Sequence, residues 1–192
     1  MDVTVVTGVP GVGASLVCQE TRKRLGAGFE LINFGDAMLE QAVARGSVES
    51  RDDMATLPLR ELELLQRRAG EYVATRARNR SIILNTHLAV GTVHGFIPGL
   101  PGDVLRDVDP DRFVLVEADP GTIANRRDSV ETREYREEGP RSIELHQDLN
   151  RAAAMNCSVE SYAPVRLVEN TGDVDDAAST LATIVSEADR SD

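Results

Sequence analysis

The sequence predicts an α/β fold in which a five-stranded parallel sheet is flanked by helices, and two observations lead to this prediction. Short apolar runs alternate along the chain with longer segments whose apolar residues recur at helical spacing. Strands that alternate with helices form a parallel sheet, because each right-handed crossover returns the chain to the same edge. The five predicted strands are residues 3–7, 30–33, 81–86, 113–117 and 165–169.

Helices are predicted between these strands. The longest covers residues 58–78, where an apolar stripe includes Leu62 and Leu65. Residues 87–101 are rich in glycine and proline and are predicted to be a loop. Residues 129–141 have little to bury and are predicted to be a polar insertion outside the core. The other predicted helices are residues 15–25, 36–45, 120–127, 142–156 and 175–188.

Charge narrows the classes of function. The chain has 192 residues, of which 32 are acidic and 21 basic, and its net charge is −11. An acidic surface repels a phosphate backbone, so we expect no nucleic-acid partner. Lys23 is the only lysine. This bias fits either a salt-adapted, halophilic surface or a genome that favours arginine codons.

The remaining composition favours a cytoplasmic protein. No apolar stretch approaches the ~18–20 residues that cross a bilayer, so no membrane partner is expected. The N-terminus begins with a strand-like run rather than with a basic signal region. Cys18 and Cys157 belong to no CxxC pair, and we expect them to be small buried residues in a reducing compartment.

A glycine-rich loop, residues 8–15, follows the first predicted strand and precedes the first predicted helix. Gly8, Gly11 and Gly13 let the backbone curl, so that successive N–H groups and the helix N-terminus face a phosphate. Ser15 can place its hydroxyl on a Mg²⁺ ion. The pattern is typical of a P-loop NTPase fold, and an ordinary strand–loop–helix turn is the alternative.

The loop lacks the lysine of the usual motif. Ala14 stands where that lysine would reach the β- and γ-phosphates of a nucleoside triphosphate. Another cation must then supply the charge, and the arginine-rich segment 126–141 is the obvious source.

Further motifs resemble the archaeal-type adenylate kinase family. Asn-Phe-Gly-Asp follows the second predicted strand, Thr-His ends the third, and Gly-Phe-Ile-Pro-Gly-Leu-Pro lies in the predicted loop beyond it. These landmarks run in the family's order across nearly the whole chain. The matching segments are residues 7–13, 33–38, 51–54, 86–87, 95–101, 131–133, 146–147 and 150–155.

The resemblance implies a nucleoside monophosphate kinase made of one domain, residues 1–192. Within it, a monophosphate-binding region would cover about residues 35–80 and a lid about residues 128–142. The implied reaction is ATP + AMP ⇌ 2 ADP, with ATP and AMP as substrates and Mg²⁺ as cofactor. The family tends to form homotrimers, so a homotrimer is also expected.

The resemblance gives each site residue a role. Arg51 would bind the AMP phosphate, and lid arginines would close over the transferring phosphoryl group. Surface ion pairs with neighbouring acids are the alternative for both. His87 is either a nucleotide contact at a strand end or a structural histidine. The ATP site would be Gly8, Val9, Pro10, Gly11, Val12, Gly13, Ala14, Ser15 and Leu16. The AMP site would be Asn33, Phe34, Gly35, Met38, Arg51, His87, Gly99 and Leu100. The lid arginines would be Arg126, Arg133 and Arg136, with Arg127 as a further candidate. The Mg²⁺ contacts would be Ser15, through ATP, and Asn85, through water.

The chain departs from the family's pattern at several positions. Besides Ala14, Asn85 replaces an aspartate at the end of the third strand, and Ala55 replaces an arginine. Tyr135 lies in an Arg-x-x-Arg sequence, where the family prefers Arg-x-Arg. Two hypotheses stay open: a working adenylate kinase, or an ATP-binding relative with weak transfer activity that acts as a sensor or assembly partner.

Overall fold

The computed structural model describes residues 1–129 and 140–188. Five parallel strands form the central sheet in the order β2-β3-β1-β6-β7, which confirms the predicted fold class. Each predicted strand is present, with boundaries that differ by at most one residue. The strands are β1 (Val3–Thr7), β2 (Phe29–Asn33), β3 (Ser81–Thr86), β6 (Arg112–Glu117) and β7 (Val165–Glu169).

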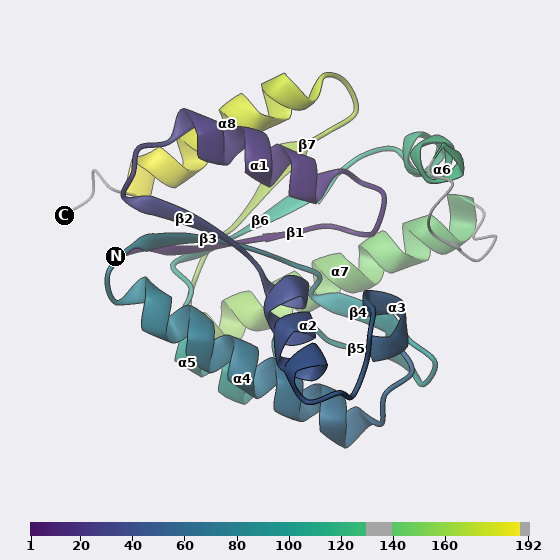
Figure 1. Cartoon of the computed structure of the whole chain (residues 1–192). Helices are drawn as coiled ribbons and strands as arrows, with labels where there is room; N and C mark the ends of the chain where they lie inside the picture. Colours follow the sequence, from purple (N-terminus) through teal and green to yellow (C-terminus); the bar gives the residue numbers. More distant parts are fainter. Residues whose placement is uncertain (130–139, 189–192) are drawn as a thin grey trace.

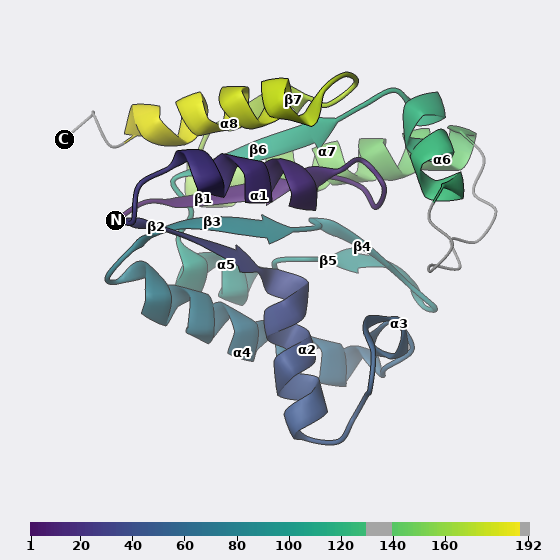
Figure 2. The same cartoon turned by 45° about the horizontal axis from the view of Figure 1, so that its top comes forward.

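Helices cover both faces of this sheet. Figure 1 shows α1 and α8 over one face and α4, α5 and α7 over the other, and the turned view in Figure 2 agrees. The helices are α1 (Ala14–Arg24), α2 (Phe34–Ala44), α3 (Arg51–Met54), α4 (Leu59–Ala77), α5 (Gly102–Val108), α6 (Pro120–Asp128), α7 (Pro140–Ser161) and α8 (Val174–Ala188). None of the helices that the structure describes is long and apolar enough to cross a membrane.

The sheet separates two apolar cores because successive side chains of a strand point to opposite faces. In β6, Phe113 packs in the core beneath α4, α5 and α7, whereas Val114 packs in the core beneath α1 and α8. In β1, Val5 packs in the core beneath α4, α5 and α7, and Val6 packs in the core beneath α1 and α8. Apolar side chains on both faces explain why the three central strands, β3, β1 and β6, are largely apolar in sequence.

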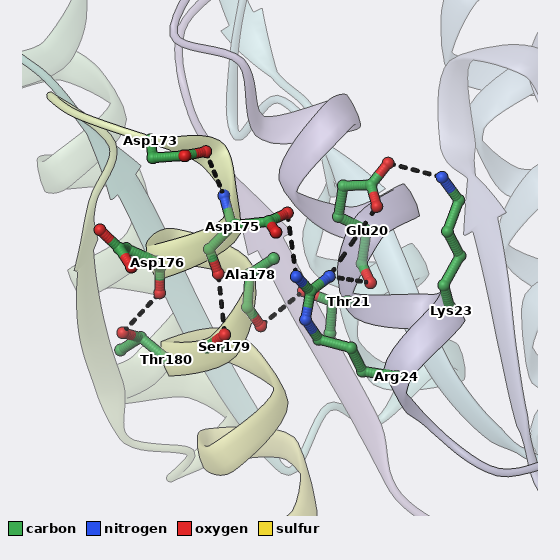
Figure 3. A network of polar contacts seen from close by, with 10 residues as sticks. All are labelled: Glu20, Thr21, Lys23, Arg24, Asp173, Asp175, Asp176, Ala178, Ser179 and Thr180. Carbon is green, nitrogen blue, oxygen red and sulfur yellow. Dashed lines mark hydrogen bonds and ion pairs between the residues drawn. The ribbon is translucent and has the colours of Figure 1, made fainter.

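α1 and α8 are joined by polar contacts as well as by their apolar sides (Figure 3). The buried Thr21 hydroxyl donates a hydrogen bond of 3.1 Å to the carbonyl of Ala178. Arg24 and Asp175 form an ion pair with an N–O distance of 2.9 Å. The helix that follows the phosphate loop is therefore fixed to the last helix of the chain.

The prediction of a plain loop at residues 87–101 is wrong. β4 (Ala89–Thr92) and β5 (Gly95–Pro98) form an antiparallel hairpin there, with Gly95 at a φ of 102°. Glycine and proline are common in loops, but they also suit a tight hairpin turn and the end of an edge strand.

The short helices α3 and α5 were not predicted either. Residues 130–139 of the predicted insertion lie outside the described residues.

The two cysteines are free thiols. Burial raises the pKa of Cys18 to about 12, and burial with the nearby charge of Glu160 raises the pKa of Cys157 to about 11. Both thiols are therefore protonated at neutral pH, which suits packing rather than nucleophilic chemistry.

Candidate active site

The carboxyl ends of the parallel strands meet at one edge of the sheet, where open α/β folds bind their ligands. The glycine-rich loop follows β1 at this edge, Asn33 is the last residue of β2, and His87 follows β3. Asn170 follows β7 at the same edge, and its N–H donates to the carbonyl of Glu117, the last residue of β6. Segments far apart in sequence therefore surround the loop.

The loop has the backbone of a phosphate cradle. Gly11 and Gly13 have φ values of 85° and 92°, a region that favours glycine, and α1 begins directly after Gly13. Gly8 lies so close to β6 that a Cβ atom there would be 2.8 Å from the carbonyl oxygen of Val116. The positive end of α1 and the turns of the loop can thus face an anion.

Three side chains hold the outer carbonyls of this loop. Arg127 Nε and Nη2 donate to the Pro10 carbonyl at 2.9 and 2.7 Å. Arg126 Nη1 and Asn170 Nδ2 donate to the Val12 carbonyl at 3.0 and 2.8 Å. The expected lid residue Arg126 therefore lies against the phosphate loop, and two further residues stabilise the shape of the loop.

The sequence alone did not assign Asn170 to the loop, and it offered Arg127 only as a further candidate for the lid. Asn170 comes directly after a predicted strand, which is a weak signal for a place at the ligand edge. Its Oδ1 is buried and has no hydrogen-bond partner among the described residues. Arg133 and Arg136, the other two expected lid arginines, lie outside the described residues.

A pocket of about 220 Å³ opens beside the loop. Most of the expected AMP residues border it, together with Ser15 from the phosphate loop and Asn85 from β3. The expected AMP residues that line it are Asn33, Phe34, Gly35, Met38, His87 and Gly99. The other lining residues are Met54, Ala55, Leu62, Gln66, Thr86, Val90, Gly91, Thr92 and Ile97.

Two expected site residues lie elsewhere. Leu100 is buried in the core beneath α4, α5 and α7, and it does not border the pocket. Leu16 is on α1 and is half exposed. Arg51 begins α3, the helix whose last residue, Met54, borders the pocket.

The loop before α3 is stabilised by Asp53. Its carboxylate accepts hydrogen bonds from the Ser50 hydroxyl at 2.8 Å and from the N–H groups of Ser50 and Glu49 at 2.9 and 3.2 Å. The Ser50 hydroxyl and these N–H groups lower the pKa of Asp53 below its usual value. The start of α3 is thus organised by a charged side chain within its own turn.

The hairpin forms the far wall of the pocket, and its base is tightly closed. The Gly99 N–H donates to the Leu88 carbonyl at 2.9 Å, and Gln66 Nε2 donates to the Pro98 carbonyl at 2.7 Å. A Cβ atom on Gly99 would lie 1.6 Å from the carbonyl oxygen of His87. Only glycine fits at this position.

His87 and Asn85 connect the pocket to the phosphate loop. Nδ1 of His87 contacts the carbonyl oxygen of Gly8. Nδ2 of Asn85 donates to Oγ of Ser15 at 2.8 Å. Sequence reasoning placed Asn85 near a metal but did not foresee this bond. The described residues include no cluster of three or more His, Cys, Asp or Glu side chains that could hold a metal ion.

Comparisons with known proteins decide which family this arrangement belongs to. A family model described as an AAA domain matches residues 7–144. The adenylate kinase of Methanothermobacter thermautotrophicus is 42% identical over 186 residues, which are 96% of this chain and 100% of the relative. The adenylate kinase of Methanopyrus kandleri is 44% identical over 175 residues, 89% of this chain and 90% of the relative. The chain belongs to the archaeal adenylate kinase family.

Two solved structures of more distant proteins share the architecture. A sugar kinase from Janibacter sp. HTCC2649 has a TM-score of 0.56 at 18% identity, with 95% of this chain and 93% of that chain covered. A gluconokinase from Sinorhizobium meliloti 1021 has a TM-score of 0.51 at 15% identity, with 97% and 95% covered. At these identities the likeness concerns the fold alone. The comparisons do not support a salt-adapted surface, which stays a prediction.

Proposed function

We propose that this chain transfers the terminal phosphoryl group of ATP to AMP with the help of Mg²⁺. The proposal rests on the position of Ser15, which is the last residue of the phosphate loop and also lines the adjoining pocket. A triphosphate on the loop would therefore point its last phosphate toward a monophosphate in the pocket. An oxygen of AMP attacks the γ-phosphorus, the bond to the β,γ-bridging oxygen breaks, and two ADP molecules result.

The residues of the chain contribute positioning and charge, because phosphoryl transfer needs little covalent chemistry from the protein. Backbone N–H groups of the loop bind the donor phosphates. Arg126, already held at the Val12 carbonyl, can turn its guanidinium onto a phosphate once a lid closes and excludes water. Lid closure of this kind is general for lidded kinases, and adenylate kinases are a standard example.

The donor set beside the loop suits a magnesium ion. The Ser15 oxygen accepts one hydrogen bond, from Asn85, and keeps a second lone pair for a hard cation such as Mg²⁺. Asn85 presents its amide nitrogen to Ser15 and would act on the metal through that hydroxyl. When bound with ATP, Mg²⁺ would neutralise charge that develops on the phosphates.

The residues at positions 14 and 85 favour a second candidate function. Ala14 carries no charge to the phosphates, and Asn85 offers no carboxylate, so a nucleotide-binding relative with weak transfer activity is the alternative. Such a protein would bind ATP and AMP and act as a sensor or assembly partner.

Diphosphate formation from ATP and different monophosphates separates these functions. We expect rapid ADP formation with AMP and slow turnover with CMP, GMP or UMP, because the resemblance assigns the pocket to AMP. Faster turnover with CMP or UMP contradicts the choice of AMP. Binding of ATP and AMP without turnover favours the sensor.

Asn85→Asp is expected to lower the Mg²⁺ concentration required for half-maximal activity. A carboxylate attracts the hydrated ion more strongly than an amide. It would also accept a hydrogen bond from the Ser15 hydroxyl and leave the serine lone pairs free. The measurement is a magnesium titration of kcat for both proteins, with circular dichroism to confirm folding.

Glu117→Gln is the matched control for that titration. Nε and Nη2 of Arg151 already bind the Glu117 carboxylate at 2.6 and 2.9 Å, and hydrogen bonding to Glu117 raises the pKa of Arg151. We expect the magnesium requirement to stay unchanged. If Glu117→Gln raises the requirement and Asn85→Asp leaves it constant, Glu117 and not position 85 serves the metal.

A homotrimer is also proposed, and exposed apolar side chains of α7 support it. Met155 and Val159 lie one turn apart and are 53% and 79% exposed, and Tyr162 follows at the end of the helix. Contact between copies would remove this apolar surface from water. Sedimentation equilibrium should give three times the mass of one chain, and Val159→Glu should lower the mass. A single-chain mass for the unmodified protein contradicts the trimer.

A further inference from the structure

A buried side chain of α7 joins the end of β1 to the segment that follows β3. The Thr7 hydroxyl donates to Oδ1 of Asn150 at 2.9 Å. The N–H of Leu88 donates to both Oγ1 of Thr7, at 3.1 Å, and Oδ1 of Asn150, at 3.2 Å. Thr7, Leu88 and Asn150 are all buried, so no bulk water replaces these bonds.

The chemistry of this cluster requires an oxygen at position 150. A backbone N–H can only donate, so the atom of Asn150 that faces Leu88 must be the carbonyl oxygen of the side chain. Loss of that oxygen would leave a buried N–H with one partner fewer and a buried hydroxyl without its acceptor. The cluster therefore depends on Thr7 and Asn150 together.

The cluster lies between the two proposed nucleotide sites. Thr7 immediately precedes Gly8 of the phosphate loop, and Leu88 immediately follows His87 of the pocket wall. The ladder between β1 and β3 ends at the pair Thr7 and Thr86. Besides the ladder, side chains join the loop to the pocket wall: the cluster, the contact of His87 with the Gly8 carbonyl, and the bond from Asn85 to Ser15.

We propose that Asn150 is a positioning residue that, with Thr7, sets the separation of the phosphate loop from the AMP pocket. The inference rests on the proposed function, because it concerns the alignment of donor and acceptor phosphates. Neither side chain lines the pocket, so each acts through the backbone of residues 8 and 87–88. A displacement of about 1 Å between reacting groups can cost about 100-fold in rate.

The test compares Thr7→Val and Asn150→Ala with Thr7→Ser, which keeps the hydroxyl. We expect kcat to fall about 10- to 100-fold in the first two variants and to stay near the original value in Thr7→Ser. Dissociation constants for ATP alone and AMP alone should change by no more than about twofold, since each site keeps its own contacts. A dinucleotide with two adenosines joined by five phosphates spans both sites, and its affinity should fall about tenfold or more.

Thr21→Val is the matched control, because Thr21 is an equally buried threonine whose hydroxyl also donates one hydrogen bond, between α1 and α8 (Figure 3). It should lower Tm but leave kcat and the dinucleotide affinity unchanged. The double variant of Thr7→Val and Asn150→Ala should be no slower than the slower single variant, because both remove the same cluster.

Several outcomes would overturn the inference. If the folded Thr7→Val variant loses only thermal stability, as the control does, and keeps its kcat and dinucleotide affinity, the cluster is merely structural. Thr7→Val and Thr7→Ser decide the matter even where Asn150→Ala fails to fold. An unmodified protein that binds the dinucleotide but transfers no phosphoryl group refutes the proposed function, while the affinity comparison still tests the positioning. A protein that binds neither nucleotide overturns both.

Discussion

Gly99→Ala is expected to destabilise the protein strongly and to disrupt the AMP pocket. The added methyl group would lie 1.6 Å from the His87 carbonyl oxygen, which is backbone and cannot rotate away. A cost of about 4 kcal/mol would lower Tm by roughly 8–16 °C in a chain of this size. Residual folded protein should show a raised KM for AMP, because the hairpin base and His87 must shift. Calorimetry and steady-state kinetics measure the two effects.

Gly26→Ala is the control for this substitution. A Cβ atom at Gly26 meets nothing within 4 Å, and its φ lies outside the left-handed region. We therefore expect little change in Tm and none in the KM for AMP. Equal effects of the two substitutions would mean that the close approach at Gly99 does not determine the pocket.

Arg126→Ala and Arg133→Ala are each expected to lower kcat by an order of magnitude or more. Ala14 leaves the β- and γ-phosphates without the usual lysine, and the transition state spreads negative charge over the equatorial oxygens. A supplied arginine is worth ~10³-fold or more in other phosphoryl-transfer enzymes. The affinity for ATP in the open protein should change little, because the backbone of the loop contributes most of that binding. Rapid-quench kinetics and ATP titration separate the two quantities.

Arg166→Ala tests whether loss of any arginine has this effect. Arg166 lies near the start of β7, away from the ligand edge, where it pairs with Glu187 at 3.6 Å. Its removal should leave kcat unchanged. If Arg126→Ala and Arg133→Ala also keep the full kcat, the lid assignment is wrong and the role of Arg126 is limited to holding the Val12 carbonyl.

The sheet could be predicted from the sequence because its signal is local. Val3–Thr7 and Ser81–Thr86 are built around apolar residues and are buried along almost their whole length, as expected of strands covered on both faces. The phosphate loop was equally visible, since its glycines lie within six residues of one another between a strand and a helix.

The hairpin and the contacts around the loop could not be predicted in the same way. Gly95 and Pro98 have the composition of a loop, and only pairing across the turn distinguishes a hairpin from a coil. Asn150 and Asn170 meet their partners 143 and 158 residues away along the chain. No local periodicity encodes such a contact, because it depends on how the whole sheet is assembled.

The hydrogen bond from Asn170 to Val12 affects when, during translation, the phosphate loop can reach its final shape. The ribosome makes the phosphate loop 158 residues before Asn170, yet the loop is bonded to Asn170 only when β7 has joined the sheet beside β6. A nascent chain arrested before residue 170 would carry the glycines without this support. Affinity for nucleotide should therefore develop only after residue 170 has been made and β7 has joined the sheet.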